Sequence, residues 1–325
     1  MKTKSIYSFL IFIIFGFTFT ACKKTDKISL PVVITYTPVY IASSSVTLGC
    51  KVESDGGSPI INCGIYMGIS QNPETTGTQL QIASDTGTFL GQVNLLLPNM
   101  QYYIKAYARN AKGESLGEQV SFTTPGTITD YDNNVYETVK IGIQLWMAKN
   151  LGTAHYLNGE PINTTTPATL DISNSTAPLY QWSYSGDDAN ALIYGKLYTW
   201  YTITDSRKVC PAGWHIPTDS DWTTLESTLG GFLIAGSELK ESGNSHWISP
   251  YNLDATNESC FKALPGGYRN ATGGFSYIGN YGYWWSSTEG DVTNAWMRSI
   301  SVQSSQISRT AFLKMNGASV RCIKD

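Results

Sequence analysis

The histidines and carboxylates of this chain are poorly spaced for catalysis. None of the three histidines, His155, His215 and His246, forms the His-x-His or His-Glu-x-x-His spacing of a zinc site. A glycosidase needs two carboxylates that face each other. The acidic residues that could supply them lie in predicted helices, where solvated carboxylates are common: Asp219, Asp221, Glu226, Glu238 and Glu241. We therefore expect no enzymatic activity and no cofactor.

The residues best suited to ligand binding are aromatic and basic, and they lie near the C-terminal end. Flat rings stack on sugar faces and on aromatic groups of protein partners, and guanidinium groups donate to ligand oxygens. The predicted ligand-binding residues are Tyr281, Tyr283, Trp284, Trp285, Arg269 and Arg298. Core packing for the aromatics and structural ion pairs for the arginines are the alternatives. Because adjacent strand residues point to opposite faces, one of the two tryptophans must face inward.

A short acidic segment is the one candidate for a metal site. Asp130, Asp132 and Asn134 alternate like the start of an EF-hand loop, but the sixth position is not glycine and the closing glutamate is missing. We interpret the segment as a polar turn that precedes a strand over residues 135–141, with a metal site as the alternative.

Composition places the chain among folded proteins and excludes some partners. It has 325 residues, of which 42% are hydrophobic and 14% charged, and its formal net charge is −3. Disorder would need the opposite balance, and nonspecific nucleic-acid binding would need a clustered basic surface. With 30 glycines, 20 tyrosines and nine tryptophans, the profile is that of a turn-rich β protein that does not bind nucleic acid.

The N-terminal segment predicts export and a lipid anchor. Lys2 and Lys4 precede an apolar stretch over residues 6–19 that is too short to span a bilayer. The residues that follow, Phe19-Thr20-Ala21-Cys22, resemble a bacterial lipobox. Cys22 would then carry lipid and hold the protein to a membrane, which is its expected membrane partner. An ordinary cleaved signal with an incidental cysteine is the alternative.

The pattern divides the chain into a signal peptide (1–21), a tether (22–29), a first domain (30–125) and a second domain (126–325). The first domain alternates apolar and polar residues in short runs separated by turn clusters. Its residues 96–110 include a Leu-x-Pro turn before Tyr102 and resemble the corner between two strands of a fibronectin type III domain, where the tyrosine hydroxyl caps the corner. Met100 replaces the threonine usual at this corner.

The second domain contains all nine tryptophans and one clear helix. That helix is predicted from about Thr218, its N-cap, to Leu229, and a shorter one is predicted around residues 237–241. Residues 157–190 have no periodicity and indicate an extended surface loop.

Several segments of the second domain occur in the order of a known family. They include Gln144-Leu145-Trp146-Met147-Ala148-Lys149-Asn150-Leu151, Cys210-Pro211-Ala212-Gly213-Trp214-His215, and Ala263-Leu264-Pro265-Gly266-Gly267-Tyr268-Arg269, and they resemble the Fibrobacter succinogenes major paralogous domain. That family in turn resembles C-type-lectin-like proteins, which implies a mixed α+β domain with long loops that form a binding face. Relatives that generate formylglycine use a cysteine pair near the C-terminus, whereas this chain has Cys322 alone there.

The cysteines divide between disulfides and free thiols. The resemblance implies a disulfide between Cys210 and Cys322. Cys50 and Cys63 would be opposite each other in a simple hairpin but lie on different sheets of a fibronectin-like sandwich, so a disulfide and two buried thiols both stay open. Cys260 is expected to pack as a small apolar side chain.

Together these patterns predict a lipid-anchored protein of the bacterial cell envelope, mostly β, in which a fibronectin III-like sandwich is followed by an α+β C-type-lectin-like domain. We expect the second domain to bind a glycan or a protein without catalysis. A secreted enzyme acting on polysaccharide or peptide, and a purely structural surface protein, are the alternatives. The expected location is the outer membrane, with either the periplasmic or the outward orientation.

Overall fold

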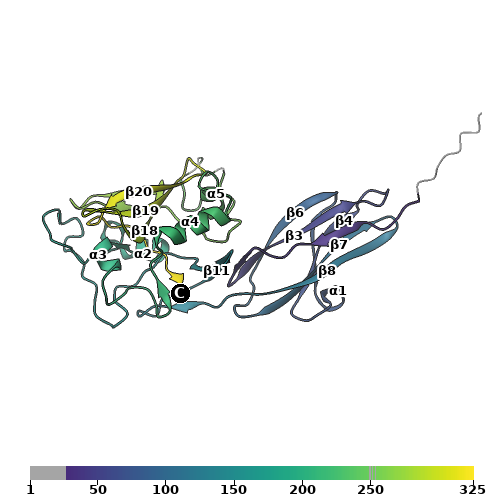
Figure 1. Ribbon diagram of the computed structural model, residues 1–325, viewed down its shortest axis with the longest axis horizontal. Coiled ribbons are helices and arrows are strands. Elements are labelled where there is room, and N and C mark those ends of the chain that lie inside the picture. The colour runs from purple at the N-terminus through teal and green to yellow at the C-terminus, as the bar shows by residue number, and fades with distance from the viewer. Residues whose placement is uncertain (1–26, 249, 251, 253) are drawn as a thin grey trace, which may run out of the picture.

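The structure, a computed structural model, describes residues 27–325 except 249, 251 and 253. Its first domain is a sandwich of two antiparallel layers (Figure 1). In one layer, β3 pairs with β6 on one edge and with β1 and β2 on the other. The other layer has the order β5-β4-β7-β8. This strand arrangement confirms the fibronectin type III-like prediction.

The elements of this domain are the strands β1 (Val32–Thr35), β2 (Tyr40–Ala42), β3 (Ser45–Ser54), β4 (Asn62–Gly68), β5 (Thr78–Ala83), β6 (Gly87–Asn94), β7 (Gln101–Asn110) and β8 (Gly113–Thr123), and the helical turn α1 (Pro73–Thr76).

The predicted tyrosine corner is present. The hydroxyl of Tyr102 accepts a hydrogen bond of 3.0 Å from the backbone N–H of Leu97. Thr124 closes the same corner because its hydroxyl donates to the carbonyl of Leu97 at 2.6 Å. Alternating residues of β3 and β7, including Leu48 and Ile104, fill the core between the two layers.

One sheet continues from the first domain into the second. Strand β2 pairs with β11 (Thr138–Ile141), and the sheet then extends through β12 (Gln144–Met147), β21 (Ile323–Lys324) and β15 (Trp214–His215). The hydroxyl of Tyr40 also donates to Glu238 of the second domain at 3.1 Å. The two domains are therefore joined by backbone hydrogen bonds as well as by the chain.

The second domain is built from short strands and short helices. Its remaining strands are β9 (Ile128–Thr129), β10 (Val135–Tyr136), β13 (Gln181–Trp182), β14 (Leu197–Tyr198), β16 (Gly266–Arg269), β17 (Phe275–Ile278), β18 (Tyr281–Glu289), β19 (Asn294–Ser301) and β20 (Ile307–Leu313). Its helices are α2 (Asp188–Tyr194), α3 (Trp200–Ile203), α4 (Asp219–Thr228) and α5 (Ala235–Leu239), with a 3-10 turn η1 (Tyr184–Gly186). The sheet β18-β19-β20 lies beside α4 in Figure 1, and α4 packs against β18 and β19.

Helix α4 follows its prediction closely. Thr218 is the N-cap, and its hydroxyl accepts from the backbone N–H of Asp221 in a capping box. Trp222 and Leu225 point into the core. The second predicted helix exists as α5 but lies earlier than expected, so Glu241 is outside it. Helix α2 was not predicted, because none of its residues is buried and it therefore has no apolar periodicity.

The segment predicted as an extended surface loop is largely irregular, but it is fixed to the domain. Ile172 and Trp182 are buried in a small apolar cluster, and strand β13 and the turn η1 interrupt the loop. Single apolar residues fix this segment to the domain, and single residues produce no periodic pattern from which its burial could be predicted.

Candidate functional site

Five aromatic rings form a continuous partly exposed surface on the second domain, which we call the tyrosine face. Its members are Tyr268, Tyr277, Tyr281, Tyr283 and Phe312. The ring centroids of Tyr281 and Tyr283 lie 5.6 Å apart, and Tyr277 is 5.3 Å from Tyr281. Tyr268 lies 5.3 Å from both Tyr283 and Phe312. These separations are those of favourable aromatic pairs.

The strands explain why these rings meet. Tyr281 and Tyr283 are two residues apart on β18, so both point to the same side of the sheet. The hairpin of β16 and β17 adds Tyr268 and Tyr277, and β20 adds Phe312. Between the two tyrosines, a Cβ atom at Gly282 would lie 2.1 Å from the Trp284 ring, so only glycine fits there.

The tyrosine face offers hydrogen-bonding groups as well as rings. None of its four tyrosine hydroxyls forms a hydrogen bond with another residue of the described chain. Tyr277 is 51% exposed. Burial raises the pKa of Tyr283 above its ordinary value, and the neighbouring tyrosines add to the rise, so this phenol stays neutral. The surface can therefore stack on a ligand and exchange hydrogen bonds with it.

The two predicted tryptophans belong to the core, and their prediction as ligand-binding residues is wrong. Trp284 and Trp285 are both fully buried. The indole N–H of Trp284 donates to Asn150 at 2.8 Å, and that of Trp285 donates to the carbonyl of Tyr198 at 2.7 Å. Both faces of β18 are covered at this point. The side chains of Trp284 and Trp285 point to opposite faces, and each is therefore buried in a different apolar cluster.

The two predicted arginines are also structural. Arg298 is 1% exposed and forms ion pairs with Asp219 at 2.6 Å and Glu226 at 2.5 Å. Arg269 is fully buried, donates to the backbone carbonyls of Ala168 and Leu170, and covers the ring of Trp182. Their donors are used inside the protein, so neither can bind a ligand.

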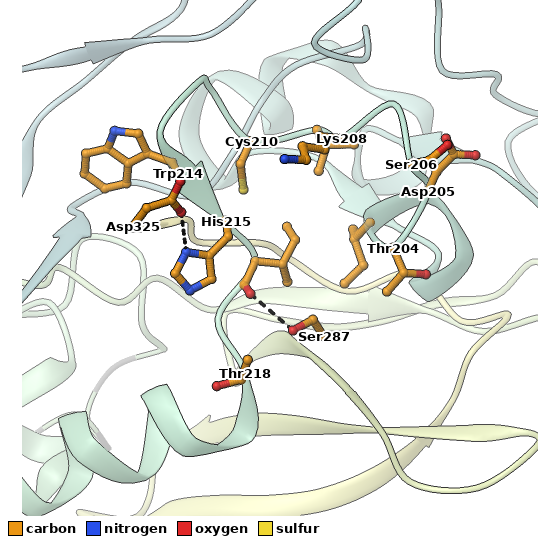
Figure 2. Close-up of a pocket in the computed structure, with 13 residues that line it drawn as sticks. Thr204, Asp205, Ser206, Lys208, Cys210, Trp214, His215, Thr218, Ser287 and Asp325 are labelled. Carbon is orange, nitrogen blue, oxygen red and sulfur yellow. Dashed lines mark hydrogen bonds and ion pairs between the residues drawn. The ribbon is translucent and has the colours of Figure 1, made fainter.

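A cavity of about 390 Å³ lies beside the disulfide of the second domain (Figure 2). In Figure 2, His215 points toward Asp325, and its Nδ1 lies 2.7 Å from a carboxylate oxygen of that residue. Its Nε2 lies 3.5 Å from Asp221. The Ser287 hydroxyl donates to the carbonyl of Ile216 at 3.2 Å. Because the serine and histidine bond to other groups, they do not form a nucleophile and base pair.

A Gly-x-Ser-x-Gly sequence occurs at residues 113–117 but has the wrong context for a hydrolase. In hydrolases this serine lies on a sharp turn between a strand and a helix. Here Ser115 lies within β8 of the sandwich, and its hydroxyl is buried without a partner in the described chain. All three histidines belong to the second domain, so this serine has no base.

The family model of the Fibrobacter succinogenes major domain matches residues 139–324, more than half of the chain. This chain belongs to the Fibrobacter succinogenes major domain family. The match confirms the predicted resemblance and contains the whole tyrosine face. No curated protein matches the chain.

Two solved structures each resemble about a third of the chain. The sensor domain of the anti-sigma factor RsgI4 from Pseudobacteroides cellulosolvens is 16% identical, with a TM-score of 0.26, over 31% of this chain and 99% of that chain. A human fibronectin type III domain is 22% identical, with a TM-score of 0.24, over 31% of this chain and 82% of that chain. The fibronectin-like assignment of the first domain rests on its own strand order and tyrosine corner.

The acidic segment of this Fibrobacter succinogenes major domain protein is a closed polar turn. Asp130 accepts hydrogen bonds from Asn134 and, at 2.5 Å, from the hydroxyl of Tyr136. Asp132 accepts from the backbone of Ala154 at 2.6 Å and lies 2.5 Å from His155 Nδ1. These carboxylates already have protein partners, as the turn interpretation expects. Among the described residues, no group of three or more histidine, cysteine or acidic side chains is arranged to hold a metal.

The predicted disulfide of the family joins Cys210 and Cys322, which are 112 residues apart. Cys50 and Cys63 are buried free thiols, the second of the two arrangements considered, and they lie beside each other in the sandwich core. Cys260 is fully buried, and its sulfur accepts from Gln92 of the first domain at 3.2 Å. Cys260 therefore packs as a small apolar side chain and also forms a hydrogen bond between the two domains.

Cys22 and the rest of the predicted signal lie outside the described residues. Within the described part of the chain, every helix is too short or too polar to traverse a bilayer. Sequence reasoning missed Tyr268, Tyr277 and Phe312. Tyr277, Tyr281 and Tyr283 are separated by four and two residues, and residues separated by an even number share one side of an extended chain. This pattern was a usable signal, but the turn between β17 and β18 interrupts the extended chain and obscures it.

Proposed function

We propose that this chain is a non-catalytic protein of the bacterial cell envelope whose second domain binds glycans through the tyrosine face. The observation that carries the proposal is the contiguity of its five rings together with its four uncommitted hydroxyls. A sugar ring presents C–H groups on its face and hydroxyls at its rim. Tyrosine matches both, because it combines an apolar ring with a polar tip.

The same proposal places the protein on a membrane through lipid at Cys22, in the outer membrane. The first domain then acts as a spacer. Its support is the continuous sheet across β2 and β11, which limits bending between the sandwich and the second domain. A binding domain held away from the lipid can reach ligands beyond the membrane surface.

The absence of catalysis is part of the proposal. It is supported by the cavity in Figure 2, where His215 is held by two carboxylates and Ser287 by backbone carbonyls. Three of the five acidic residues that could have supplied a glycosidase pair already have partners inside the protein. Asp219 and Glu226 form ion pairs with Arg298, and Glu238 accepts a hydrogen bond from Tyr40.

The test is binding of the chain without residues 1–22 to a glycan array and to insoluble neutral polysaccharides, with calcium and with EDTA. Tyr277→Ala and Tyr281→Ala should each weaken binding at least about fivefold, the loss typical of a contact residue that matters. Tyr131→Ala is the matched control, because Tyr131 is 52% exposed and lies outside the tyrosine face. Its binding should equal that of the unmodified chain.

The proposal fails if no glycan binds, or if the two tyrosine variants bind as well as the control. Binding that disappears in EDTA would also contradict it, because stacking on tyrosine needs no metal.

A further inference from the structure

A long groove lined by three lysines runs beside helix α2. It consists of three adjoining cavities of about 250, 380 and 370 Å³. Val135 and Lys149 line both the first and the central cavity, while Asp188 and Lys196 line both the central and the third. Because shared side chains connect the cavities, we treat them as one site and call it the lysine groove.

The two carboxylates of the first cavity and its Lys262 have partners inside the protein. Its Lys262 lies 3.1 Å from Glu137, and its Glu241 lies 2.7 Å from the ring nitrogen of His246. Each carboxylate in this cavity therefore has a basic neighbour, and the unpaired charge at this end is that of Lys149, which the first cavity shares with the central one.

The central cavity carries an excess of positive charge. Lys149 is exposed and has no ion pair within 4.0 Å in the described chain. Lys196 has one carboxylate, that of Asp188, at 4.0 Å. The Asp188 carboxylate is 92% exposed and already accepts from the Ser183 hydroxyl at 2.6 Å. The two lysines thus face one acid at 4.0 Å, and the more distant Asp132, which is already bonded to Thr153 and His155, adds a second attraction on Lys196.

Lys196 carries an ammonium group that is partly buried and has no close counter-ion in the described chain. Its side chain is only 14% exposed, and the Ser183 oxygen at 3.3 Å is its nearest hydrogen-bond partner. Burial lowers its pKa, and the carboxylates of Asp188 and Asp132 only partly oppose this. A partly desolvated ammonium group without a close counter-ion is costly, so an anion placed beside it would be stabilised.

The third cavity has no net charge, because the charges of Asp188 and Lys196 offset each other, and it is rich in hydrogen-bonding groups. Three consecutive threonines, Thr164, Thr165 and Thr166, line it together with Gln181 and Ser183. The Thr165 hydroxyl is already bonded to Trp182 and Ala168, and the Ser183 hydroxyl donates to Asp188. The side-chain oxygen of Gln181 is buried and accepts no hydrogen bond from the described chain. The hydroxyls of Thr164 and Thr166 and the Gln181 oxygen have no partner in the described chain, and such groups suit a ligand that carries hydroxyls.

We infer that the lysine groove binds a linear acidic polysaccharide, with a uronate carboxylate between Lys149 and Lys196 and a neighbouring sugar ring in the hydroxyl-lined third cavity. The row of three cavities favours a chain-like ligand, the paired lysines favour an anion, and the threonines favour a sugar over an acidic peptide. This inference refines the proposed glycan binding but uses none of the residues of the tyrosine face, so the two can fail separately.

Binding of polygalacturonate to the chain without residues 1–22, measured by calorimetry at low and high salt, tests the inference. Lys149→Ala should weaken binding roughly tenfold, as expected for the loss of a charged hydrogen bond. Lys140→Ala removes the same charge from an exposed position outside the groove and should have little effect. Lys196→Met keeps the apolar stem and should also weaken binding roughly tenfold; if this variant does not fold, Lys149→Ala decides. Tyr281→Ala should bind polygalacturonate normally.

Three results would overturn the inference. The first is no binding of polygalacturonate at low salt. The second is equal weakening by Lys149→Ala and Lys140→Ala, which would indicate a general charge effect. The third is equal or tighter binding of polyglutamate, which would make the groove a site for acidic peptides.

Discussion

Ser43 of the first domain and Thr138 of the second are bonded to each other in both directions. The backbone N–H of Ser43 donates to the Thr138 carbonyl at 2.8 Å, and the backbone N–H of Thr138 donates to the Ser43 hydroxyl, also at 2.8 Å. The same hydroxyl donates to the carbonyl of Gly126 at 2.8 Å. Ser43 is 1% exposed, so these bonds are shielded from water and fix the junction.

Replacing Ser43 should loosen the junction. Ser43→Ala leaves the Thr138 N–H without its acceptor in a buried place, which should cost about 1–3 kcal/mol. Urea unfolding measures the loss, and hydrogen exchange should accelerate at the Thr138 amide. Ser121→Ala, at an exposed position of β8, is the control and should change neither. Unaltered exchange at Thr138 in the Ser43 variant would show that the junction does not depend on this hydroxyl.

The buried ion pair of Arg298 should dominate the acid sensitivity of the second domain. Burial alone would raise the pKa of Asp219, but hydrogen bonds from Arg309 and Arg298 outweigh it and hold the pKa below its ordinary value. The stabilisation is therefore complete above about pH 4, the ordinary aspartate pKa, and is lost as the pH falls below it.

Arg298→Met should destabilise the protein by about 3–5 kcal/mol at pH 7, because the partly buried Glu226 loses its cation and Asp219 keeps only that of Arg309. Between pH 7 and pH 3, the free energy of unfolding of this variant should also fall less steeply than that of the unmodified chain, as measured by denaturant unfolding. Arg109→Met is the control, since its pair with Glu114 is half-exposed and is worth about 0–1 kcal/mol. Equal losses in both variants would contradict the assignment.

Removal of the disulfide should cost the second domain much of its stability. The bond between Cys210 and Cys322 closes a loop of 112 residues, and the chain-entropy model gives about 4–5 kcal/mol for such a loop. The Cys210→Ser, Cys322→Ser double variant should therefore unfold at much lower denaturant. Dithiothreitol should lower the stability of the unmodified chain but leave the double variant unchanged; sensitivity of that variant to the reductant would point to another disulfide.

The three remaining cysteines of the described chain should be unreactive until the protein unfolds. Burial raises the pKa of Cys50 to about 12, the neighbouring Cys63 adds to the rise, and burial also raises the pKa of Cys63. The reactive thiolate is therefore scarce at neutral pH. A thiol reagent should count no thiols in the folded chain without residues 1–22 and three after denaturation. A count of one after denaturation would mean that Cys50 and Cys63 are joined.

Substitution of Trp285 should lower the folding stability of the protein, because this side chain belongs to the core. Trp285→Ala removes a fully buried indole and its hydrogen bond to Tyr198, and should cost about 3–5 kcal/mol. Tyr277→Ala, on the exposed surface, should change stability by no more than about 0.5 kcal/mol. Urea unfolding compares the two. A stable Trp285 variant that merely loses glycan binding would restore this tryptophan to the ligand site.

The sequence by itself determined the features that depend on local chemistry. Thr218 predicted the start of α4, because an N-cap depends only on the residues of the first turn. Tyr102 after a Leu-x-Pro turn predicted the corner of the first domain, and segment order predicted the family and its disulfide.

Only the tertiary structure decided which side chains meet a ligand and which meet the core. The exposure of a residue depends on the layers that cover each face of its strand, and these come from distant parts of the chain. Trp284 and Trp285 point in opposite directions and are both buried, because an apolar cluster lies on each side of β18. The tyrosine face and the lysine groove join residues from separate strands, loops and helices, so their chemistry appears only when the chain is folded.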